Sequence, residues 1–270
     1  MASAPPAPLL GPLLARGATA EVFSTGGDRV IKLLLPGRPR AAAAREAALG
    51  QLVNRLGIPA PQVHDLVEID GRHGVIFERI DGPSMLDAIV AQPWRVLRLA
   101  PLLGTLHARI HRAPLPADAA DGPELRRLTN ELDRKIGQFT HTPPDERAAA
   151  LEQLMALKER GAASPPSLCH GDFHPGNVIL TARGPVVVDW NDATLGPPEA
   201  DVARTGVLML HGELPAAIGG AKRVAIQTTR RLLHALYLRR YRTLTGMSDA
   251  QIEPWRFPTI VARRAEGVGR

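Results

Sequence analysis

The sequence predicts an α+β protein of two lobes, with a small antiparallel β lobe and one helix first, and a larger, mostly helical lobe after it. Before Gly82, short apolar runs alternate with turns rich in Gly and Pro, which is typical of antiparallel strands. After Gly82, leucine and isoleucine recur at helical spacing over several long segments. We therefore predict two domains, residues 1–81 and residues 82–270.

The N-terminal lobe is predicted to hold two hairpins and one helix. The expected strands are residues 22–23, 30–35, 63–69 and 74–80. They pair in sequence order, with one turn at residues 26–28 and the other at Asp70 and Gly71. Between the hairpins, the alanine-rich residues 40–56 have the composition of a strong helix former.

The C-terminal lobe is predicted from apolar residues spaced so that one face of each helix meets a core. The expected helical segments span the apolar positions 94–110, 125–136 and 151–157. Two short strands, residues 178–180 and 186–188, interrupt the helical pattern. Arginine alternates with leucine over residues 230–242, which predicts a further helix with a solvated arginine face.

The composition excludes several classes of protein. Of 270 residues, 44% are hydrophobic and 22% are charged, as in soluble globular proteins. No apolar run reaches the roughly 18 residues that a membrane span needs, so we expect no membrane partner. The N-terminus lacks the basic and apolar regions of a signal peptide. The single cysteine, Cys169, excludes internal disulfides and suits a reducing compartment, so we expect a cytoplasmic protein.

Basic charge is concentrated near the C-terminus. Residues 222–270 hold 11 Lys and Arg against 3 Asp and Glu, whereas the remainder holds 22 basic and 24 acidic residues. A basic region of this kind is one way to bind nucleic acid. The chain has only ten aromatic residues, which is little material for stacking bases, so we do not expect a nucleic-acid partner.

The densest group of polar residues lies between residues 169 and 190. Asp172 and Asn177 are five positions apart in a loop bent by Gly and Pro, and Asp189 follows three valines. Polar groups beside short apolar strands are costly to bury unless they bind something or one another. The oxygen atoms of Asn177 and Asp189 suit a divalent cation, and Asp172 would then accept a hydrogen bond from an attacking hydroxyl group.

These residues resemble the aminoglycoside phosphotransferase and choline-kinase-like family, which has the protein-kinase-like fold. The matching motifs, in order, are His170-Gly-Asp172 followed by Asn177, then Val188-Asp189-Trp190, then Gly196 followed by Asp201-Val-Ala. The resemblance implies that Asp172 is the catalytic base and that Asn177 and Asp189 hold Mg²⁺. It also implies that Asp201 braces the loop.

A lysine in an apolar strand supports the same interpretation. Lys32 lies between two apolar residues, in a chain that has 4 lysines and 29 arginines. A flexible ammonium group suits the α- and β-phosphates of a nucleotide. Glu46, fourteen residues on in the predicted helix, is placed to pair with Lys32 and fix its direction. The resemblance assigns the same roles to both residues.

The remaining nucleotide contacts come from the resemblance alone. Kinases of this kind place three glycines over the phosphates, and in the matching residues 15–22 only Gly17 is present. Residues 77–80 match the hinge segment, where backbone groups of Glu78 and Ile80 would meet the adenine.

Together these features predict a Mg²⁺-dependent kinase that moves the γ-phosphate of ATP or GTP to a hydroxyl group of a small molecule. The resemblance leaves the acceptor open among aminoglycosides, choline-like amines, sugars and amino-acid-like alcohols. The shortage of aromatic residues argues against a quaternary-ammonium cage. A cationic aminoglycoside needs an acidic pocket. The candidates for its acidic residues are Asp192, Glu199, Asp201 and Glu213.

Two alternatives use the same residues differently. The chain could be a catalytically idle kinase-like binding or regulatory protein, although every expected catalytic residue is present. His170, Asp172 and His174 also have the spacing of a metal-ligand cluster in a metallohydrolase. The other histidines, His107 and His111 among them, are not expected to form a second cluster beside carboxylates.

Overall fold

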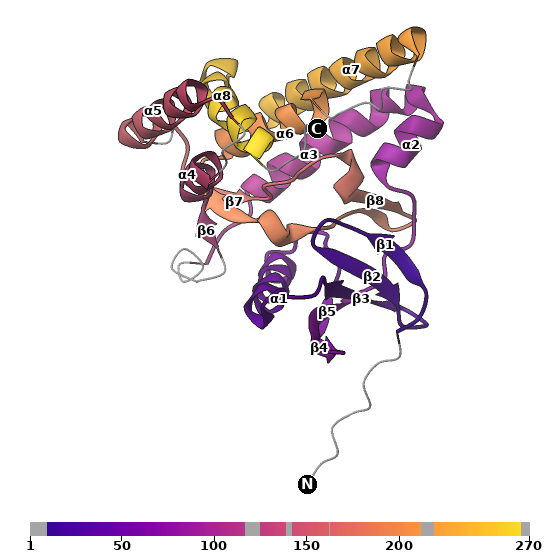
Figure 1. The fold of residues 1–270 in the computed structure, drawn as a ribbon. Coiled ribbons are helices and arrows are strands. Elements are labelled where there is room, and N and C mark those ends of the chain that lie inside the picture. The colour runs from indigo at the N-terminus through magenta and orange to yellow at the C-terminus, as the bar shows by residue number, and fades with distance from the viewer. Residues whose placement is uncertain (1–9, 117–124, 139–141, 162, 212–218, 266–270) are drawn as a thin grey trace. The chain divides into compact units, whose positions relative to one another are not determined.

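The structure, a computed structural model, describes residues 10–116, 125–138, 142–161, 163–211 and 219–265 (Figure 1). The chain divides into two compact units. The N-terminal unit consists of the residues up to Pro83 together with Ile179–Asn191, and the C-terminal unit consists of Ser84–Val178 and the chain from Asp192 onward. The predicted domain boundary at residue 81 stays a prediction, and it did not assign residues 179–191 to the N-terminal unit.

The N-terminal unit is built on a five-stranded antiparallel sheet in the order β1-β2-β3-β5-β4. Its strands are β1 (Leu13–Arg16), β2 (Ala20–Ser24), β3 (Arg29–Leu34), β4 (Val63–Ile69) and β5 (Arg72–Glu78). Both predicted hairpins are present, as β2–β3 and β4–β5. The second one turns at Asp70 and Gly71, whose φ angles of 50° and 72° are those of a two-residue type I′ turn.

Helix α1 (Arg40–Arg55) lies where the alanine-rich segment predicted it. Ala43 and Ala47, one turn apart, pack against Ala20, Leu34 and Val75 of the sheet. Small side chains on this face allow the helix to approach the sheet closely. Glu46 lies on the same buried face and is 5% exposed, so this charged side chain needs a partner.

A short two-stranded sheet, β8 (Val178–Thr181) and β9 (Gly184–Val187), completes the N-terminal unit. The backbone N–H of Leu180 donates to the carbonyl of Pro83, and that of Val187 donates to the carbonyl of Pro59. The strand predicted at residues 186–188 spans Gly184–Val187 in the structure, so it begins two residues earlier and ends one residue sooner. This anchoring fixes the end of β9, where Asp189 follows.

The C-terminal unit is mostly helical, as predicted. Its α-helices are α2 (Met85–Ala91), α3 (Val96–His111), α4 (Leu128–Gln138), α5 (Pro144–Arg160), α6 (Pro198–His211), α7 (Gly220–Thr245) and α8 (Asp249–Ala265). The predicted helical segments correspond to α3, α4 and α5, and the arginine-rich segment lies in α7. A small sheet orders its strands as β6 (Arg126–Arg127), β10 (Thr194–Gly196) and β7 (Ser167–Cys169).

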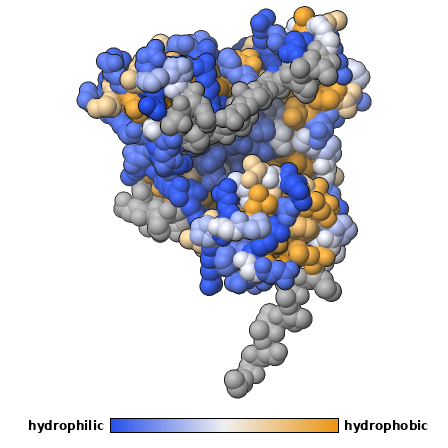
Figure 2. All heavy atoms as spheres, in the orientation of Figure 1, coloured by the Kyte–Doolittle hydropathy of each residue, from blue (hydrophilic) through white to orange (hydrophobic). Residues whose placement is uncertain are grey.

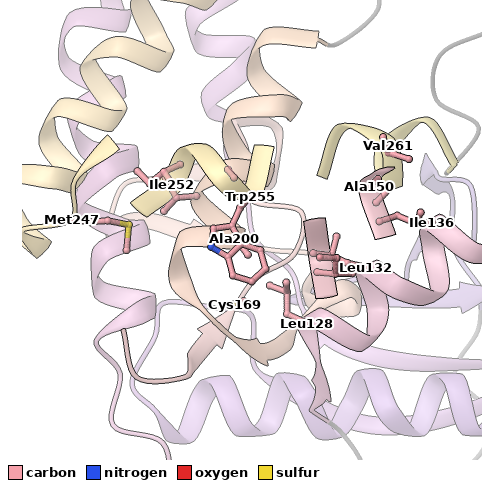
Figure 3. Close-up of a cluster of buried hydrophobic side chains, with 14 of the residues drawn as sticks. Leu128, Leu132, Ile136, Ala150, Cys169, Ala200, Met247, Ile252, Trp255 and Val261 are labelled. Carbon is pink, nitrogen blue, oxygen red and sulfur yellow. The ribbon is translucent and has the colours of Figure 1, made fainter. Parts of the chain in front are cut away.

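A core of buried apolar side chains holds α4, α5, α6 and α8 together (Figure 3). Leu132 and Ile136 of α4 pack with Leu154 of α5 and with Trp255 of α8. Burying each such side chain contributes about 1.5–3 kcal/mol. Cys169 is fully buried in the same core, as a small apolar residue would be.

The surface is mainly hydrophilic in the view of Figure 2, with hydrophobic atoms gathered over β1 and β2. On α7, Arg231, Arg239 and Arg240 are exposed whereas Leu233 and Tyr237 are buried, so the predicted arginine face is solvated. Within the described residues, none of the helices combines the length and the apolar character that crossing a membrane requires.

Candidate active site

Lys32 is the centre of a charged cluster in the N-terminal unit. Its Nζ lies 2.8 Å from Oε1 of Glu46 on α1 and 2.8 Å from Oδ1 of Asp189, which follows β9. The Lys32 side chain is 16% exposed, so the ammonium group is partly shielded from water. The structure thus brings together three residues that the sequence singled out. Two of them, Lys32 and Asp189, are 157 residues apart in the chain.

The two carboxylates keep the ammonium group charged. Burial by itself would lower the pKa of Lys32, but the charges of Glu46 and Asp189 outweigh burial and hold this pKa above its usual value. Burial raises the pKa of Glu46, and the charge of Lys32 opposes that rise. Lys32 is therefore a fixed positive charge at neutral pH, and its two partners determine its direction.

Asp189 has an unusual backbone conformation. Its φ angle is 63°, in the left-handed region that residues other than Gly rarely adopt. The next residue, Trp190, is buried and donates from Nε1 to the carbonyl of Val187, while Asn191 donates from Nδ2 to Oδ1 of Asp189. Left-handed residues of this kind persist where the surroundings hold them, and they cluster at functional sites.

The three other expected nucleotide contacts lie in the same unit. Gly17 lies between β1 and β2, where a Cβ atom would come no closer than 3.6 Å to the carbonyl of Ala20, so this position does not require Gly. Glu78 ends β5, and its backbone N–H donates to the carbonyl of Gln62 at 2.8 Å. That N–H is therefore already used. Ile80 follows β5 in the segment that leads to Pro83.

In the C-terminal unit, Asp172 and Asn177 lie together on the loop from β7 to β8. Nδ2 of Asn177 donates to the backbone oxygen of Asp172 at 2.9 Å and to its Oδ2 at 3.1 Å. Nε2 of His174 lies 3.6 Å from Oδ2, and Nη2 of Arg204 lies 4.0 Å from Oδ1. The carboxylate of Asp172 is 26% exposed, so an acceptor can reach it.

The surroundings keep Asp172 ionised. Burial by itself would raise the pKa of this carboxyl group, but the hydrogen bond and charge of His174 and the charges of Arg204 and His170 lower it well below its usual range. Asp172 is therefore a carboxylate at physiological pH. It can accept a hydrogen bond from a hydroxyl group and orient that group for attack.

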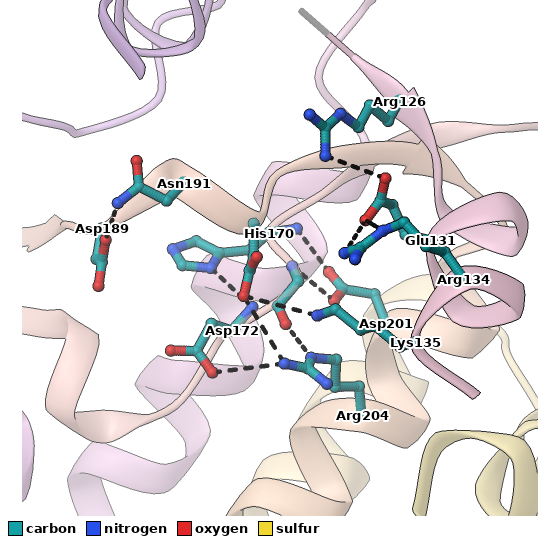
Figure 4. A network of polar contacts seen from close by, with 12 residues as sticks. Arg126, Glu131, Arg134, Lys135, His170, Asp172, Asp189, Asn191, Asp201 and Arg204 are labelled. Carbon is teal, nitrogen blue, oxygen red and sulfur yellow. Dashed lines mark hydrogen bonds and ion pairs between the residues drawn. The ribbon is translucent and has the colours of Figure 1, made fainter. Parts of the chain in front are cut away.

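The backbone of this loop is held by two residues of α6 (Figure 4). Asp201 on α6 accepts the N–H of His170 at Oδ2, at 2.8 Å, and the N–H of Gly171 at Oδ1, at 3.0 Å. Arg204, one turn on, donates from Nε to the carbonyl of Gly171. Gly171 has a φ angle of 79°, and a Cβ atom there would lie 2.2 Å from the carbonyl oxygen of Asp192. Only glycine fits this position.

Asp201 also accepts hydrogen bonds from two histidines, which contradicts our expectation about His107 and His111. Their Nε2 atoms lie 3.0 and 3.2 Å from Oδ2 of Asp201. Their Nδ1 atoms lie 2.6 and 2.7 Å from the hydroxyl groups of Tyr237 and Tyr241 on α7. The spacing of four residues within each pair places both histidines on one face of α3 and both tyrosines on one face of α7.

His107, His111 and Asp201 are also the one group, among the described residues, whose ligand atoms lie close enough to hold a metal ion. A cation is not needed to satisfy them. Each ring donates from Nε2 to Asp201 and accepts a tyrosine hydroxyl at Nδ1, which uses both nitrogens. We therefore interpret the group as a hydrogen-bond network. His170 and His174 likewise each accept a backbone N–H at Nδ1, which does not favour the metallohydrolase alternative.

We expect the protein to lose stability in mild acid because of His107. Burial lowers the pKa of His107 to about 3. A histidine in an unfolded chain has a pKa of about 6.5, so the unfolded state binds one more proton between these two values. The free energy of unfolding should therefore fall as the pH falls from about 6 towards 3, by up to about 1.4 kcal/mol per pH unit. Urea denaturation at pH 7 and pH 5 measures this change.

Two variants separate His107 from the other titrating groups. His107→Gln should be less stable than the wild type at pH 7 but should lose less stability between pH 7 and pH 5. His64→Gln changes an exposed histidine in the N-terminal unit and should keep the wild-type dependence on pH. The same pH dependence in His107→Gln and in the wild type would contradict the assignment.

The fold has known counterparts among kinases of small molecules. The chain resembles the aminoglycoside phosphotransferase APH(3'')-Id from Streptomyces rimosus in complex with ADP and streptomycin, at a TM-score of 0.63 and 19% identity, over 90% of each chain. It also resembles the amicoumacin kinase hAmiN in complex with AMP-PNP, Ca²⁺ and Ami, at a TM-score of 0.61 and 15% identity, over 94% of this chain and 79% of that chain. These likenesses confirm the predicted protein-kinase-like α+β fold.

Sequence comparison identifies the family. The mouse (Mus musculus) protein acyl-CoA dehydrogenase family member 10 is 28% identical over 60% of this chain, and the match spans 16% of that protein's length. The model of the "Phosphotransferase enzyme family" matches residues 12–237, from the start of the N-terminal sheet into α7. Because this match takes in most of the chain and all the expected site residues, the protein belongs to the phosphotransferase enzyme family.

Proposed function

We propose that this phosphotransferase is a Mg²⁺-dependent kinase that transfers the γ-phosphate of ATP or GTP to a hydroxyl group of a small molecule. The observation that carries the proposal is the contact of Lys32 with Glu46 and Asp189 in a member of this family. An ammonium group held by a buried carboxylate is suited to neutralise the phosphates of a nucleotide. The neighbours whose structures hold ADP or AMP-PNP support a nucleotide as the phosphoryl donor.

The N-terminal unit supplies the proposed nucleotide contacts. Lys32 binds the α- and β-phosphates, and Glu46 orients Lys32 from the buried face of α1. The segment at Gly17 covers the phosphates through its backbone. The adenine meets backbone groups of Glu78 and Ile80, with the N–H of Glu78 excluded because it already donates to Gln62.

Asn177 and Asp189 are the proposed ligands of Mg²⁺. The amide nitrogen of Asn177 donates to Asp172, which leaves its side-chain oxygen turned the other way. The side chain of Asp189 is 45% exposed after β9. An amide oxygen and a carboxylate form the oxygen ligand set that Mg²⁺ prefers, so these residues fit the ion. When bound, Mg²⁺ neutralises negative charge on phosphate oxygens.

Asp172 is the proposed base. Its carboxylate orients the hydroxyl group of the acceptor and takes the proton while the hydroxyl oxygen bonds to the γ-phosphorus and the bond to the β,γ-bridging oxygen breaks. Because the surroundings lower the pKa of Asp172, it is a weak base, and its larger contribution is to position the hydroxyl group. The described residues include every proposed catalytic group, so no observation favours the catalytically idle alternative.

Asp189→Ala should remove the stabilisation that Mg²⁺ and ATP together give the protein. With ligand at about 100 times its Kd, the wild type should gain about 5–10 °C in Tm. The variant should gain little, because the ion that ties the nucleotide to the protein loses a carboxylate ligand. Thermal unfolding with MgATP, and with ATP and EDTA, measures the difference.

The matched control is Asp28→Ala, which removes a 93% exposed carboxylate from a turn of the same unit and should keep the full shift. A wild-type protein that MgATP does not stabilise would argue against the proposed function. A full shift in Asp189→Ala would argue against the assignment of Asp189 alone.

A further inference from the structure

His174 lies two residues after the proposed base and caps the turn that leads to Asn177. It precedes the short 3-10 helix η3 (Pro175–Asn177). Its Nδ1 accepts the N–H of Gly176 at 3.0 Å, and its carbonyl oxygen accepts the N–H of Asn177 at 2.9 Å. A side chain that accepts a backbone N–H in this way fixes the start of a helical turn. His174 therefore sets the turn between the proposed base and a proposed ligand of Mg²⁺.

The cap also determines which ring nitrogen of His174 turns a proton toward the base. A nitrogen that accepts an N–H group uses its lone pair and carries no proton there, so the proton of the ring lies on the other nitrogen, Nε2. Nε2 of His174 lies 3.6 Å from Oδ2 of Asp172. The ring therefore turns a donor toward the carboxylate that is proposed to orient the hydroxyl group of the acceptor.

Gly176 leaves room for this orientation of the ring. A Cβ atom at residue 176 would lie 2.7 Å from Cε1 and 2.9 Å from Nδ1 of His174, closer than a side chain and a ring approach one another. The imidazole ring thus lies over a residue without a side chain. Both contacts of His174, with the N–H of Gly176 and with Asp172, depend on this placement.

Oδ2 of Asp172 faces donors from both ends of the same turn. Nδ2 of Asn177 lies 3.1 Å away, and Nε2 of His174 lies 3.6 Å away. Rotation of the carboxylate would take Oδ2 away from both. The other oxygen, Oδ1, lies on the side of Arg204, whose Nη2 is 4.0 Å away. With Oδ2 held in this way, Oδ1 is the oxygen that meets the hydroxyl group.

Two other roles fit these contacts less well. As the base, His174 would need a nitrogen without a proton that faces the acceptor, but Nδ1 accepts the N–H of Gly176 and Nε2 carries the proton. As a cap alone, it would need no donor at Nε2. Its side chain is 31% exposed, so water could take the place of that donor at little cost in stability.

We propose that His174 is a positioning residue for phosphoryl transfer: its Nε2–H group, together with the side-chain amide of Asn177, holds Oδ2 of Asp172, so that Oδ1 orients the hydroxyl group and takes its proton. The inference rests on the proposed function, and it adds a residue to the same site. His174 acts through Asp172 and does not itself touch the reacting atoms.

Two substitutions at residue 174 divide the two contacts of the ring. In His174→Asn, the amide oxygen takes the place of Nδ1 and keeps the cap, but no donor reaches Asp172. In His174→Gln, the amide nitrogen takes the place of Nε2 and keeps a donor toward Asp172, but the cap is lost. The first variant therefore tests the positioning of the base, and the second tests the turn.

His174→Asn should lower kcat by about tenfold, as the loss of one hydrogen bond made to the base gives, with the wild-type Tm and the wild-type KM for MgATP. His174→Gln should keep kcat within about threefold of the wild type, while its Tm falls by about 2–4 °C. Hydrolysis of ATP labelled with ³²P at the γ-phosphate measures kcat and KM, because water presents the same O–H group to Asp172 as an alcohol does.

The matched control is His64→Asn, which makes the same change at an exposed position of β4 and should keep the wild-type kcat. Wild-type kcat in His174→Asn would overturn the proposal. A larger loss of kcat in His174→Gln than in His174→Asn would overturn it too, because activity would then follow the cap and not the donor.

A double-mutant cycle tests whether His174 acts through Asp172. In the background of Asp172→Asn, the carboxylate that His174 holds is gone, so adding His174→Asn should lower kcat by less than about threefold further. The same tenfold loss in both backgrounds would contradict the proposal, because His174 would then contact the reacting groups directly.

Binding of MgATP separates this inference from the proposed function. MgATP should raise the Tm of the wild type and of His174→Asn equally, because the proposed phosphate contacts come from Lys32. If MgATP stabilises both proteins and both hydrolyse it at the same rate, the role of His174 is wrong and the proposed function stands. If MgATP neither stabilises the wild type nor is hydrolysed by it, the proposed function fails, and this inference with it.

Discussion

Asp172→Asn should reduce turnover by about 10²- to 10⁴-fold, the usual contribution of a base that also positions its substrate. The amide keeps an oxygen that can accept the hydrogen bond from Asn177, and the backbone of the loop is held by Asp201 and Arg204. The loop should therefore keep its conformation. The variant loses the negative charge that orients the hydroxyl group and accepts its proton. Product formation under single-turnover conditions measures the loss.

Nucleotide binding decides how the loss is interpreted. Asp172→Asn should show the same Tm shift with MgATP as the wild type, because the proposed phosphate contacts come from Lys32 in the other unit. Asp145→Asn changes an exposed carboxylate in the first turn of α5 and should keep wild-type turnover. If Asp172→Asn turns over at the wild-type rate, another group is the base.

The parts of the site that could be predicted from the sequence are those fixed by local pattern. A single lysine inside an apolar strand and a glutamate in an alanine-rich helix indicated the contact between Lys32 and Glu46, because β3 and α1 are adjacent in the chain and pack together. Asp172 and Asn177 were found because both lie on one short loop. Apolar runs separated by turn residues likewise predicted both hairpins, and the alanine-rich composition of residues 40–56 predicted α1.

The resemblance implies that Asp201 braces the loop, and its contacts with the N–H groups of His170 and Gly171 agree with that. The histidines and tyrosines that hold Asp201 could not be predicted, because they lie far apart in the sequence. His107 is 94 residues from Asp201 and 130 residues from Tyr237. No local motif links a pair of histidines on one helix to a pair of tyrosines on another. The one available signal was the shared spacing of four residues in both pairs, on helices that also present apolar faces.

The sequence makes Glu199 and Asp201 candidates for the acidic residues of an acceptor pocket, but both are buried inside the protein. Oδ2 of Asp192, a further candidate, lies 3.9 Å from Nζ of Lys135 and 3.8 Å from Nη2 of Arg204. Glu213 lies outside the described residues.

The shortest strands could not be predicted from the sequence pattern either. The strands β6, β7 and β10 are two or three residues long, too short for an alternation of apolar and polar side chains to be seen. β9 ends at Val187 and not at the third valine, because the chain turns into the left-handed conformation of Asp189. The apolar run predicted a strand, but it could not show where the backbone leaves it.

Asp201→Asn should both destabilise the protein and reduce turnover. The carboxylate accepts N–H groups from His170, Gly171, His107 and His111, and an amide replaces one accepting oxygen with a donor. At least one buried N–H group then faces another donor, at a cost of about 2–4 kcal/mol in the free energy of unfolding. The Tm should fall by about 5–10 °C.

Turnover separates a role in positioning from a role in stability alone. Measured well below the Tm of the variant, kcat for Asp201→Asn should still be reduced, because Asp201 holds the two backbone N–H groups that precede Asp172. Tyr237→Phe removes a hydroxyl group that contacts His107 and not Asp201 itself, so the N–H bonds to Asp201 stay intact. This variant should lower the free energy of unfolding by about 1 kcal/mol and keep kcat. A folded Asp201→Asn protein with wild-type kcat would mean that the loop holds Asp172 without this carboxylate, and that the network serves stability only.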